Sequence, residues 1–281
     1  MTRYLLAYAG FAILSAAATL SFSSVSRGQT TPLIGGGYTA VMSIPANDSE
    51  IKAIGAALFK PSGTGPFPAV VYMTGCGGID SPANRAQQKT IADHLVSKGI
   101  AILIVDSFTP RNEAKGVCAS LGALDGEKAT QFATRGSNDA LAAVATLKAM
   151  PAIDAKRIFL TGFSLGGTSS LLAVDTKNPA SQRAGVAGVI AYYPFCYDGV
   201  DPSVPVLALV GDKDDWTGAP KCQAVTGKPN FNLVVYPGVM HAFATPFPTP
   251  VDVLGHHLVY DQNAAQDAQQ RADAFIAAQI K

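Results

Sequence analysis

Ser164 lies in the stretch TGFSLGG, between Gly162 and Gly166, and fits the pattern Gly-x-Ser-x-Gly. A serine hydroxyl is a poor nucleophile until a nearby base takes its proton, and that base in turn needs an acceptor that orients it. The motif is short enough to arise by chance, so its surroundings must separate a nucleophile from an ordinary serine that caps a helix.

The surroundings of Ser164 predict a sharp turn from a strand into a helix. The apolar run RIFLTGF precedes the serine, and LGGTSSLLAV follows it. A turn of this kind strains the backbone of the serine and leaves no room for side chains at the flanking positions, which explains the glycines. The N-H groups at the start of the following helix would point toward an oxyanion formed near Ser164. We therefore interpret Ser164 as a nucleophile.

A serine nucleophile requires a histidine base, and the chain has four histidines. His241, in VVYPGVMHAF, comes a few residues after a predicted strand. His94 lies within a predicted amphipathic helix, where a partly buried or surface position is expected. His256 and His257 have no predicted strand ahead of them, which indicates a solvated loop. His241 is accordingly the predicted general base, which takes the serine proton and returns it to the leaving group.

The stretch PVLALVGDKDDWTG supplies carboxylates that could orient the base. Asp212, Asp214 and Asp215 follow the second predicted strand after Ser164, so the chain order is Ser, Asp, His, as in α/β-hydrolases. The residues themselves leave the choice among the three open. The two that are not used would serve as structural capping residues.

Two backbone amides are predicted to form an oxyanion hole. One belongs to Leu165, the residue after the nucleophile, and the other to Cys76 in the loop TGCGG. Cys76 is nominated for its amide and not for its sulfur.

The elements that must position these residues alternate along the chain. Short apolar runs bounded by Gly, Pro or Asp predict strands at 54–59, 69–74, 101–105, 157–161, 186–193, 206–210 and 232–236. Helical patterns lie at 83–97, 137–150, 165–175, 219–225 and 263–280. This alternation predicts an α/β fold with a doubly wound, mostly parallel central sheet and helices on both faces. Functional groups in such a sheet gather at the carboxyl ends of its strands.

From about residue 54 to 280 the chain resembles the dienelactone hydrolase family of the α/β-hydrolases. The resemblance rests on VVYMTGCGG, VDSFTPR, RIFLTGFSLGG, LVGDKDDW, YPGVMHAF and the closing YDQNAAQDAQQRADAFI, in that order. It implies an α/β-hydrolase fold. Because the sequence has no Cys-x-x-Cys pair and no clustered histidines, no metal is expected, and the predicted reaction needs no cofactor. The resemblance also implies Ser164 as nucleophile, His241 as base, Asp214 as the acid, and oxyanion donors at Cys76 and Leu165.

Two departures limit what the resemblance implies. The dienelactone-cleaving members use a cysteine nucleophile and a glutamate at the oxyanion loop, where this chain has Ser164 and Gly75. Arg111, in DSFTPR, matches a family arginine that binds a substrate carboxylate, although an exposed loop arginine is the ordinary alternative. Trp216, beside the acid loop, is expected either to line the substrate pocket or to pack against the sheet.

The N-terminus has the layout of a secretory signal. Arg3 precedes an apolar stretch at residues 4–20, and small residues follow it. We predict a signal peptide and a disordered N-terminus at residues 1–30, cleavage between residues 19 and 31, and one domain at 31–281. The mature protein would then be periplasmic or secreted, without stable membrane association. An uncleaved membrane anchor is the alternative.

Export would expose the four cysteines to an oxidising compartment. Cys76 and Cys118 follow neighbouring predicted strands, so we expect them to pair, which leaves Cys196 and Cys222 as the second pair. The aperiodic segment 107–135, which contains Cys118, is expected to cover the pocket.

The charge pattern excludes other classes of function. The formal net charge is +1 and no basic run occurs, so nucleic-acid binding is not expected. The sequence thus predicts an exported serine hydrolase for small-molecule carboxylic esters or lactones. One alternative is a peptidase or amidase on the same fold, although such peptidases usually carry a large extra domain that a chain of 281 residues would not accommodate. The other is a non-catalytic α/β-hydrolase-like binding protein.

Overall fold

The computed structural model describes residues 37–280, in which one eight-stranded sheet forms the centre of the fold. The predicted signal peptide and the predicted start of the domain at residue 31 lie outside the described residues. The order of strands across the sheet is β1-β2-β4-β3-β5-β6-β7-β8. Their bounds are β1 (Ala40–Pro45), β2 (Ala53–Phe59), β3 (Phe67–Met73), β4 (Ala101–Asp106), β5 (Ile153–Phe163), β6 (Gly188–Tyr192), β7 (Val206–Gly211) and β8 (Phe231–Tyr236).

Most of the sheet is parallel, as predicted. β3 pairs in parallel with β4 and β5, and the parallel pairing continues through β6 and β7 to β8. Only β1 and β2, at one edge, run antiparallel to their neighbours. Strand β1 was not predicted. It is a partly exposed edge strand that ends in a proline, so it lacks the continuous apolar run by which the buried strands were found.

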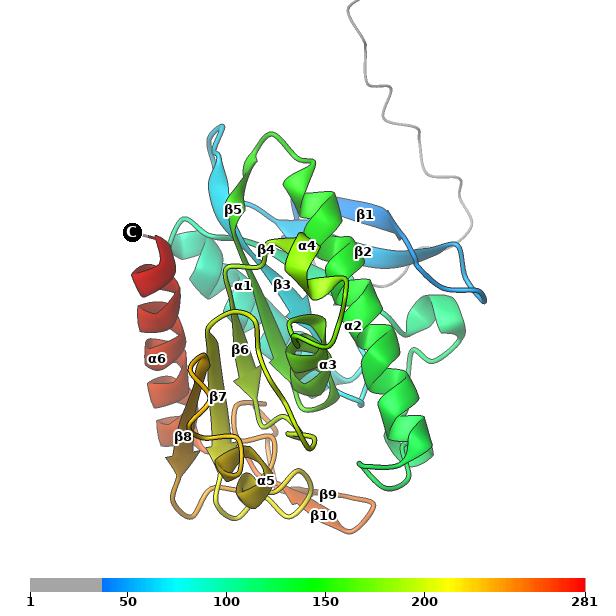
Figure 1. Cartoon of the computed structure of the whole chain (residues 1–281), viewed down its shortest axis with the longest axis vertical. Helices are drawn as coiled ribbons and strands as arrows, with labels where there is room; N and C mark the ends of the chain where they lie inside the picture. The colour runs from blue at the N-terminus through cyan, green and yellow to red at the C-terminus, as the bar shows by residue number, and fades with distance from the viewer. Residues whose placement is uncertain (1–36, 281) are drawn as a thin grey trace, which may run out of the picture. The chain divides into compact units, whose positions relative to one another are not determined.

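Helices cover both faces of the sheet, which is also as predicted (Figure 1). α2 (Glu127–Lys148) and α3 (Leu165–Ala173) pack on one face, and α1 (Pro82–Ser97) and α6 (Gln262–Ile280) pack on the other. The remaining short helices are α4 (Ser181–Ala184), α5 (Ala219–Gln223), η1 (Thr109–Arg111) and η2 (Cys118–Ser120). None of the helices within residues 37–280 is both long and apolar enough to cross a membrane.

Helix α2 begins at Glu127, ten residues before the predicted start at 137. Gly136 immediately precedes that predicted start. In the structure Gly136 allows α2 to approach α3, because a Cβ at this position would lie 2.4 Å from the Ser169 hydroxyl oxygen. The glycine therefore serves helix packing and does not end the helix. The predicted cover at 107–135 is consequently part loop and part helix.

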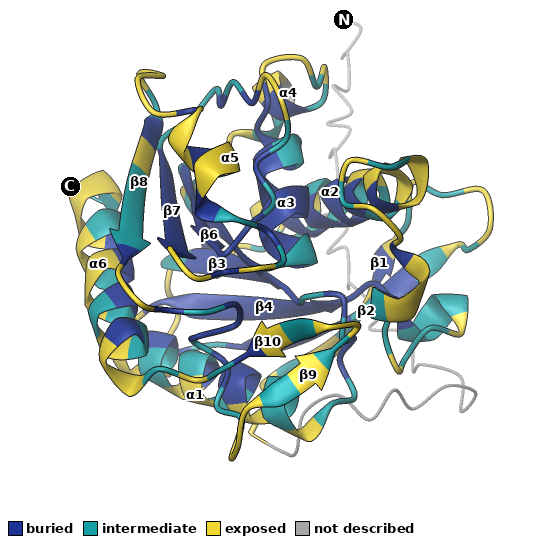
Figure 2. Ribbon diagram, turned by 90° about the horizontal axis from the view of Figure 1, so that it is seen from below, coloured by how far each residue is buried: buried dark blue, intermediate teal, exposed yellow. Residues whose placement is uncertain are grey.

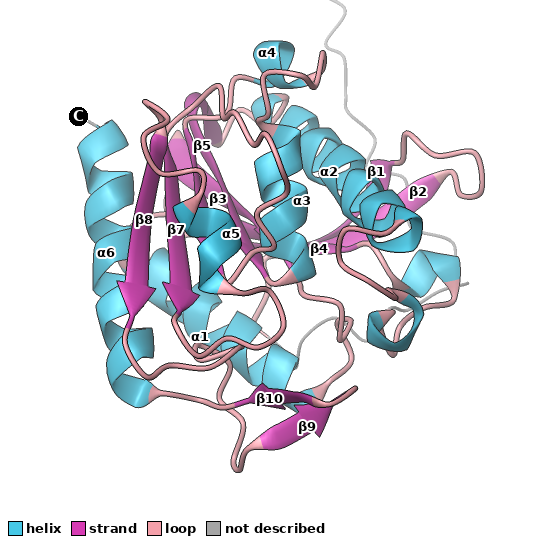
Figure 3. Cartoon of the chain, turned by 60° about the horizontal axis from the view of Figure 1, so that its bottom comes forward, coloured by secondary structure: helices cyan, strands magenta, loops and turns pink. Residues whose placement is uncertain are grey.

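A short hairpin lies beyond the carboxyl ends of β7 and β8 (Figure 3). It consists of β9 (Val251–Val253) and β10 (His256–Leu258), which pair antiparallel. The prediction of a loop around His256 and His257 was thus wrong, because strands of three residues are too short to give a periodic signal. Figure 2 shows that the hairpin is partly exposed, whereas the central strands are buried.

Both predicted disulfide pairings are present. Cys76 is bonded to Cys118, and Cys196 is bonded to Cys222. The first joins the loop after β3 to helix η2, and the second joins the segment after β6 to helix α5.

Candidate active site

Ser164 stands at the tip of the turn between β5 and α3 with φ 51° and ψ −117°, a strained conformation for a residue with a side chain. Its N-H donates to the carbonyl oxygen of Tyr192 on β6 over 2.9 Å, which holds the turn in register with the sheet. A Cβ on Gly162 would lie 2.1 Å from the carbonyl oxygen of Gly166, and a Cβ on Gly166 would lie 2.3 Å from that of Met73. Both flanking positions must therefore be glycine, as the motif predicted.

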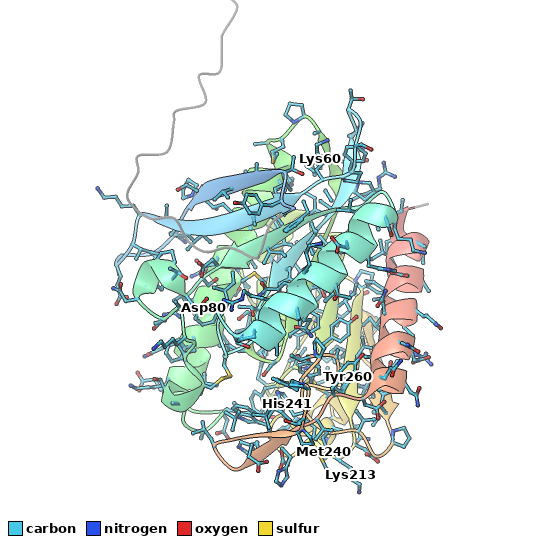
Figure 4. The ribbon with its side chains drawn as sticks, turned by 180° about the vertical axis from the view of Figure 1, so that it is seen from behind. Lys60, Asp80, Lys213, Met240, His241 and Tyr260 are labelled. Atoms are coloured by element: carbon cyan, nitrogen blue, oxygen red, sulfur yellow. A yellow bond between two sulfur atoms is a disulfide. The ribbon has the colours of Figure 1, made fainter. Side chains whose placement is uncertain are left out.

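His241 lies on the loop after β8, with its side chain almost completely buried. Its Nε2 is 3.1 Å from Oγ of Ser164, and its Nδ1 is 2.7 Å from Oδ2 of Asp214. The ring packs against the rings of Tyr193 and Trp216, at centroid distances of 5.0 and 5.3 Å. Figure 4 shows His241 at the same end of the molecule as the hairpin. This packing, together with a bridge to Leu258 of β10, fixes the imidazole between the hydroxyl and the carboxylate.

Among the three candidate carboxylates, Asp214 is the one that faces His241. It also accepts hydrogen bonds from the amides of Trp216 and Thr217 and from the Thr217 hydroxyl, over 2.7 to 2.9 Å. Burial by itself raises the pKa of Asp214, but the hydrogen bond and charge of His241 and the bonds from Thr217 outweigh burial and lower the pKa to about 2. The carboxylate is therefore ionised at neutral pH.

The other two carboxylates point elsewhere. Asp212 accepts a hydrogen bond from the amide of Gly238, and Asp215 accepts one from the amide of His257 on the hairpin. Position within the acid loop thus separates the three residues, a choice that the local sequence left open and for which the family resemblance implied Asp214.

The predicted oxyanion donors belong to two segments close to Ser164. A Cβ on Gly75, the residue before Cys76, would be 3.4 Å from Cβ of Ser164, so the loop after β3 passes close to the serine. Within residues 37–280, the amides of Cys76 and Leu165 donate to no protein acceptor. The Cys76 sulfur is bonded in a disulfide, so Cys76 can bind a ligand through its backbone amide.

A cavity of about 320 Å³ opens beside Ser164. Trp216 lines it, as one of its two predicted alternatives stated, and at the same time stacks on His256 of the hairpin with centroids 4.8 Å apart. The other walls come from α2, α3, α5 and the loops after β6 and η2. The lining residues are Leu121, Leu124, Asp125, Ala129, Thr130, Ala133, Leu165, Thr168, Leu172, Phe195, Tyr197, Asp198, Thr217 and Lys221.

Arg111 does not line this cavity, so the geometry gives no support to its predicted role as a substrate ligand. Its guanidinium donates to the carboxylates of Asp48 and Asp139 and to the carbonyl oxygen of Ser107, so that all five of its N-H groups are used. Its side chain is 2% exposed. The arginine instead ties the segment after β1 to helix α2 through η1. Asp48 and Asp139 lie 63 and 28 residues from Arg111 in the sequence, so the sequence offered no sign of this pairing.

Thr217 is a site residue that sequence reasoning missed. Its hydroxyl oxygen is 2.7 Å from Oδ2 of Asp214 and 3.5 Å from Nδ1 of His241. It follows Asp214 by three residues in DDWTG, a spacing that also suits a simple turn, so the sequence alone carried only a weak signal. No group of three or more potential metal ligands occurs in the described part of the chain.

A family model described as the dienelactone hydrolase family matches residues 54–280. The chain belongs to the dienelactone hydrolase family. Among curated members, it is 30% identical over 207 residues to the probable 2-oxo-3-(5-oxofuran-2-ylidene)propanoate lactonase of Bradyrhizobium sp., a match that covers 67% of this chain and 78% of that protein.

Solved structures similar to this dienelactone hydrolase family member have the same fold. A dienelactone hydrolase-like promiscuous phosphotriesterase from metagenomic libraries is 18% identical with a TM-score of 0.66, over 86% of this chain and 99% of the other. A thermophilic esterase from Thermogutta terrifontis is 17% identical with a TM-score of 0.60, over 86% and 92% of the two chains. The predicted α/β-hydrolase fold and the predicted family are both confirmed.

Proposed function

We propose that this protein is an exported serine hydrolase that cleaves carboxylic esters or lactones through an acyl-enzyme intermediate. The observation that carries the proposal is the continuous row of hydrogen bonds from Ser164 through His241 to Asp214, at 3.1 and 2.7 Å. Such a row is what an activated serine requires. Membership of the dienelactone hydrolase family supports ester and lactone bonds as the class of target.

In the first half of the reaction, Oγ of Ser164 attacks the carbonyl carbon of the substrate while Nε2 of His241 takes the hydroxyl proton. The charge that develops on the carbonyl oxygen is held by the amides of Cys76 and Leu165. Asp214 accepts the Nδ1-H of the imidazole, which sets the tautomer and stabilises the imidazolium. His241 then gives its proton to the leaving alcohol, and the acyl group stays on Ser164.

In the second half, a water molecule gives a proton to His241 and attacks the acyl group on Ser164. The tetrahedral intermediate uses the same two amides. It collapses to the free acid as the proton returns from His241 to Oγ. No group beyond these side chains and amides is needed for either half. For a lactone the leaving alcohol remains attached to the acyl chain, so the product is a hydroxy acid.

Export is the second part of the proposal. It is supported by the signal-like N-terminal sequence and by two disulfides that leave no free cysteine among the described residues, which suits an oxidising compartment. A serine nucleophile suits the same compartment, because an exposed thiolate would be oxidised there. Sequencing the N-terminus of the protein recovered from periplasm and from culture medium tests this part. A retained Met1 in a cytoplasmic fraction would contradict it.

The hydrolase proposal is tested by intact-protein mass spectrometry after exposure to an alkyl fluorophosphonate, together with release of p-nitrophenol from a short-chain ester. We expect one adduct on Ser164, and loss of both adduct and turnover in Ser164→Ala and His241→Ala. His94→Asn is a matched control, because His94 pairs with Asp273 between α1 and α6 and lies away from the site. A folded wild-type protein with neither adduct nor turnover would point to the binding-protein alternative.

A further inference from the structure

The cavity beside Ser164 owes its space to small side chains on helix α2. Ala129 and Ala133 are four residues apart and so lie on one face of the helix, and both line the cavity. Leu165, Thr168 and Leu172 line it from a matching face of α3. The volume, about 320 Å³, is near the lower limit for small-molecule pockets. The cavity thus fits one compact group of a substrate.

Hydrophobic side chains make up most of its walls. Leu121 and Leu124 follow helix η2 and close one side. Phe195 and Trp216 close the side nearer the acid loop. An apolar group that leaves water for such walls is stabilised in proportion to the apolar area that is buried.

The polar groups in the lining are already used within the protein. The hydroxyl of Thr130 donates to the carbonyl oxygen of Gly126, and the hydroxyl of Tyr197 donates to Asp175 over 2.6 Å. The oxygen of Thr168 accepts the amide N-H of Phe195.

The Thr217 hydroxyl is likewise held by Asp214. Apart from Ser164 and the oxyanion amides, the described lining therefore offers few free partners for a polar substrate group.

Charge is confined to the rim of the cavity. Asp125 and Asp198 are exposed, and Lys221 is their one cationic neighbour in the described lining. Lys221 forms an ion pair with Asp198 over 3.2 Å in a solvent-exposed position. Arg111, the cation expected to receive a carboxylate, is sealed between Asp48 and Asp139. A carboxylate inside the cavity would lose its water and meet no cation other than Lys221 at the rim, which is already paired with Asp198.

We infer that the substrates of this site are uncharged esters or lactones that carry a compact apolar group, and that substrates with a carboxylate on that group are rejected. This inference rests on the proposed hydrolase function. The apolar group fills the space between α2 and α3 while the ester carbonyl lies at Ser164.

The test compares p-nitrophenyl hexanoate with the p-nitrophenyl monoester of adipic acid, which ends in a carboxylate where the other ends in a methyl group. A second pair, n-pentyl acetate and the acetate ester of 5-hydroxypentanoic acid, places the same change on the alcohol side. We expect kcat/KM to favour the methyl-ended substrate by about 100-fold in at least one pair, because an unpaired carboxylate is costly to bury. Equal rates in both pairs, or a preference for the carboxylate, would overturn the inference.

Leu124→Lys sharpens the test, because it places a cation in a partly exposed part of the wall. We expect it to reduce the preference for the methyl-ended substrate at least tenfold, whereas Leu124→Met should leave the preference unchanged. An unaltered preference in Leu124→Lys would contradict a charge-based origin.

The fluorophosphonate reaction separates the two proposals. An adduct on Ser164 with no discrimination between matched esters refutes only the substrate class. If neither adduct nor ester turnover occurs, the hydrolase function fails and the substrate inference fails with it.

Discussion

Two buried ion pairs lie near the same end of the sheet, and their chemistry differs despite almost equal burial. The side chains of Arg111 and Asp139 are 2% and 1% exposed, and those of His241 and Asp214 are also 2% and 1% exposed. Every N-H of Arg111 is bonded within the protein, whereas His241 keeps Nε2 directed at the hydroxyl of Ser164. Burial and charge therefore do not identify a reactive pair. A reactive pair is identified by a ring nitrogen that remains directed at a nucleophile.

The two carboxylates also differ in pKa. Burial raises the pKa of Asp139, and the bonds from Arg111 offset only part of that rise. Burial acts on Asp214 as well, but His241 and Thr217 bring its pKa down to about 2. The hydrogen bond and charge of His241 contribute most to this lowering of the Asp214 pKa, and the side-chain and backbone bonds from Thr217 add to it.

The strongest test of this comparison is Asp214→Asn. The amide side chain would favour the wrong imidazole tautomer and would no longer stabilise the imidazolium, so kcat should fall by about 10⁴-fold. Ester turnover by the purified variant measures the loss, and circular dichroism checks that the variant is folded. The matched control is Asp215→Asn, the adjacent residue, which bonds to the hairpin and should keep turnover within about threefold. Comparable losses of turnover in both variants would show that turnover depends on the conformation of the loop and not on the carboxylate that faces His241.

Arg111→Met tests the other ion pair, Arg111–Asp139, which we expect to stabilise the fold without taking part in turnover. It leaves Asp139 buried without its cation and should lower the free energy of unfolding by about 3 kcal/mol or more, with turnover per folded molecule nearly unchanged. Urea unfolding with ester turnover measured in parallel gives both values. A large loss of turnover in the folded variant would restore Arg111 as a substrate ligand.

The effect of Arg111→Met on the free energy of unfolding should depend on pH, because Asp139 titrates. A carboxyl whose pKa in the folded state is above its unfolded value binds its proton more tightly when folded, so the destabilisation should shrink as the pH falls through the folded pKa. Arg111→Met combined with Asp139→Asn should recover part of the stability at neutral pH. If the double variant is no more stable than Arg111→Met, the buried charge is not the cause of the loss.

The smallest expected effect concerns Thr217, a positioning residue in the bond network of Asp214. Thr217→Val removes a hydroxyl bond to the carboxylate but keeps the shape of the side chain, and should lower kcat about tenfold with little change in KM. The loss of that bond should also raise the pKa of Asp214 from about 2. Thr217→Ser should restore kcat. Failure of the serine to rescue would indicate that the methyl group, and not the hydroxyl, is required.

Much of the fold and part of the candidate site could be read from local patterns. The seven predicted strands are mostly apolar runs, and the turn at Ser164 needs glycines for steric reasons that act within a few residues. Strand β1, the hairpin and the first turns of α2 were missed, because short or partly exposed elements lack a clear period. The glycine in α2 has a packing role that depends on Ser169 of α3, which no local pattern reveals.

By itself, the sequence determined the chain order of strands β2 to β8 and of the longer helices between them, the turn that presents Ser164, and the short set of residues from which its partners would come. Only the tertiary structure decided that Asp214, and not its two neighbours in the loop, faces His241. The tertiary structure also decided that Arg111 is enclosed by Asp48 and Asp139. The physical reason is range: steric limits on a turn act between adjacent residues, whereas an ion pair depends on groups that the fold brings together from distant positions in the chain.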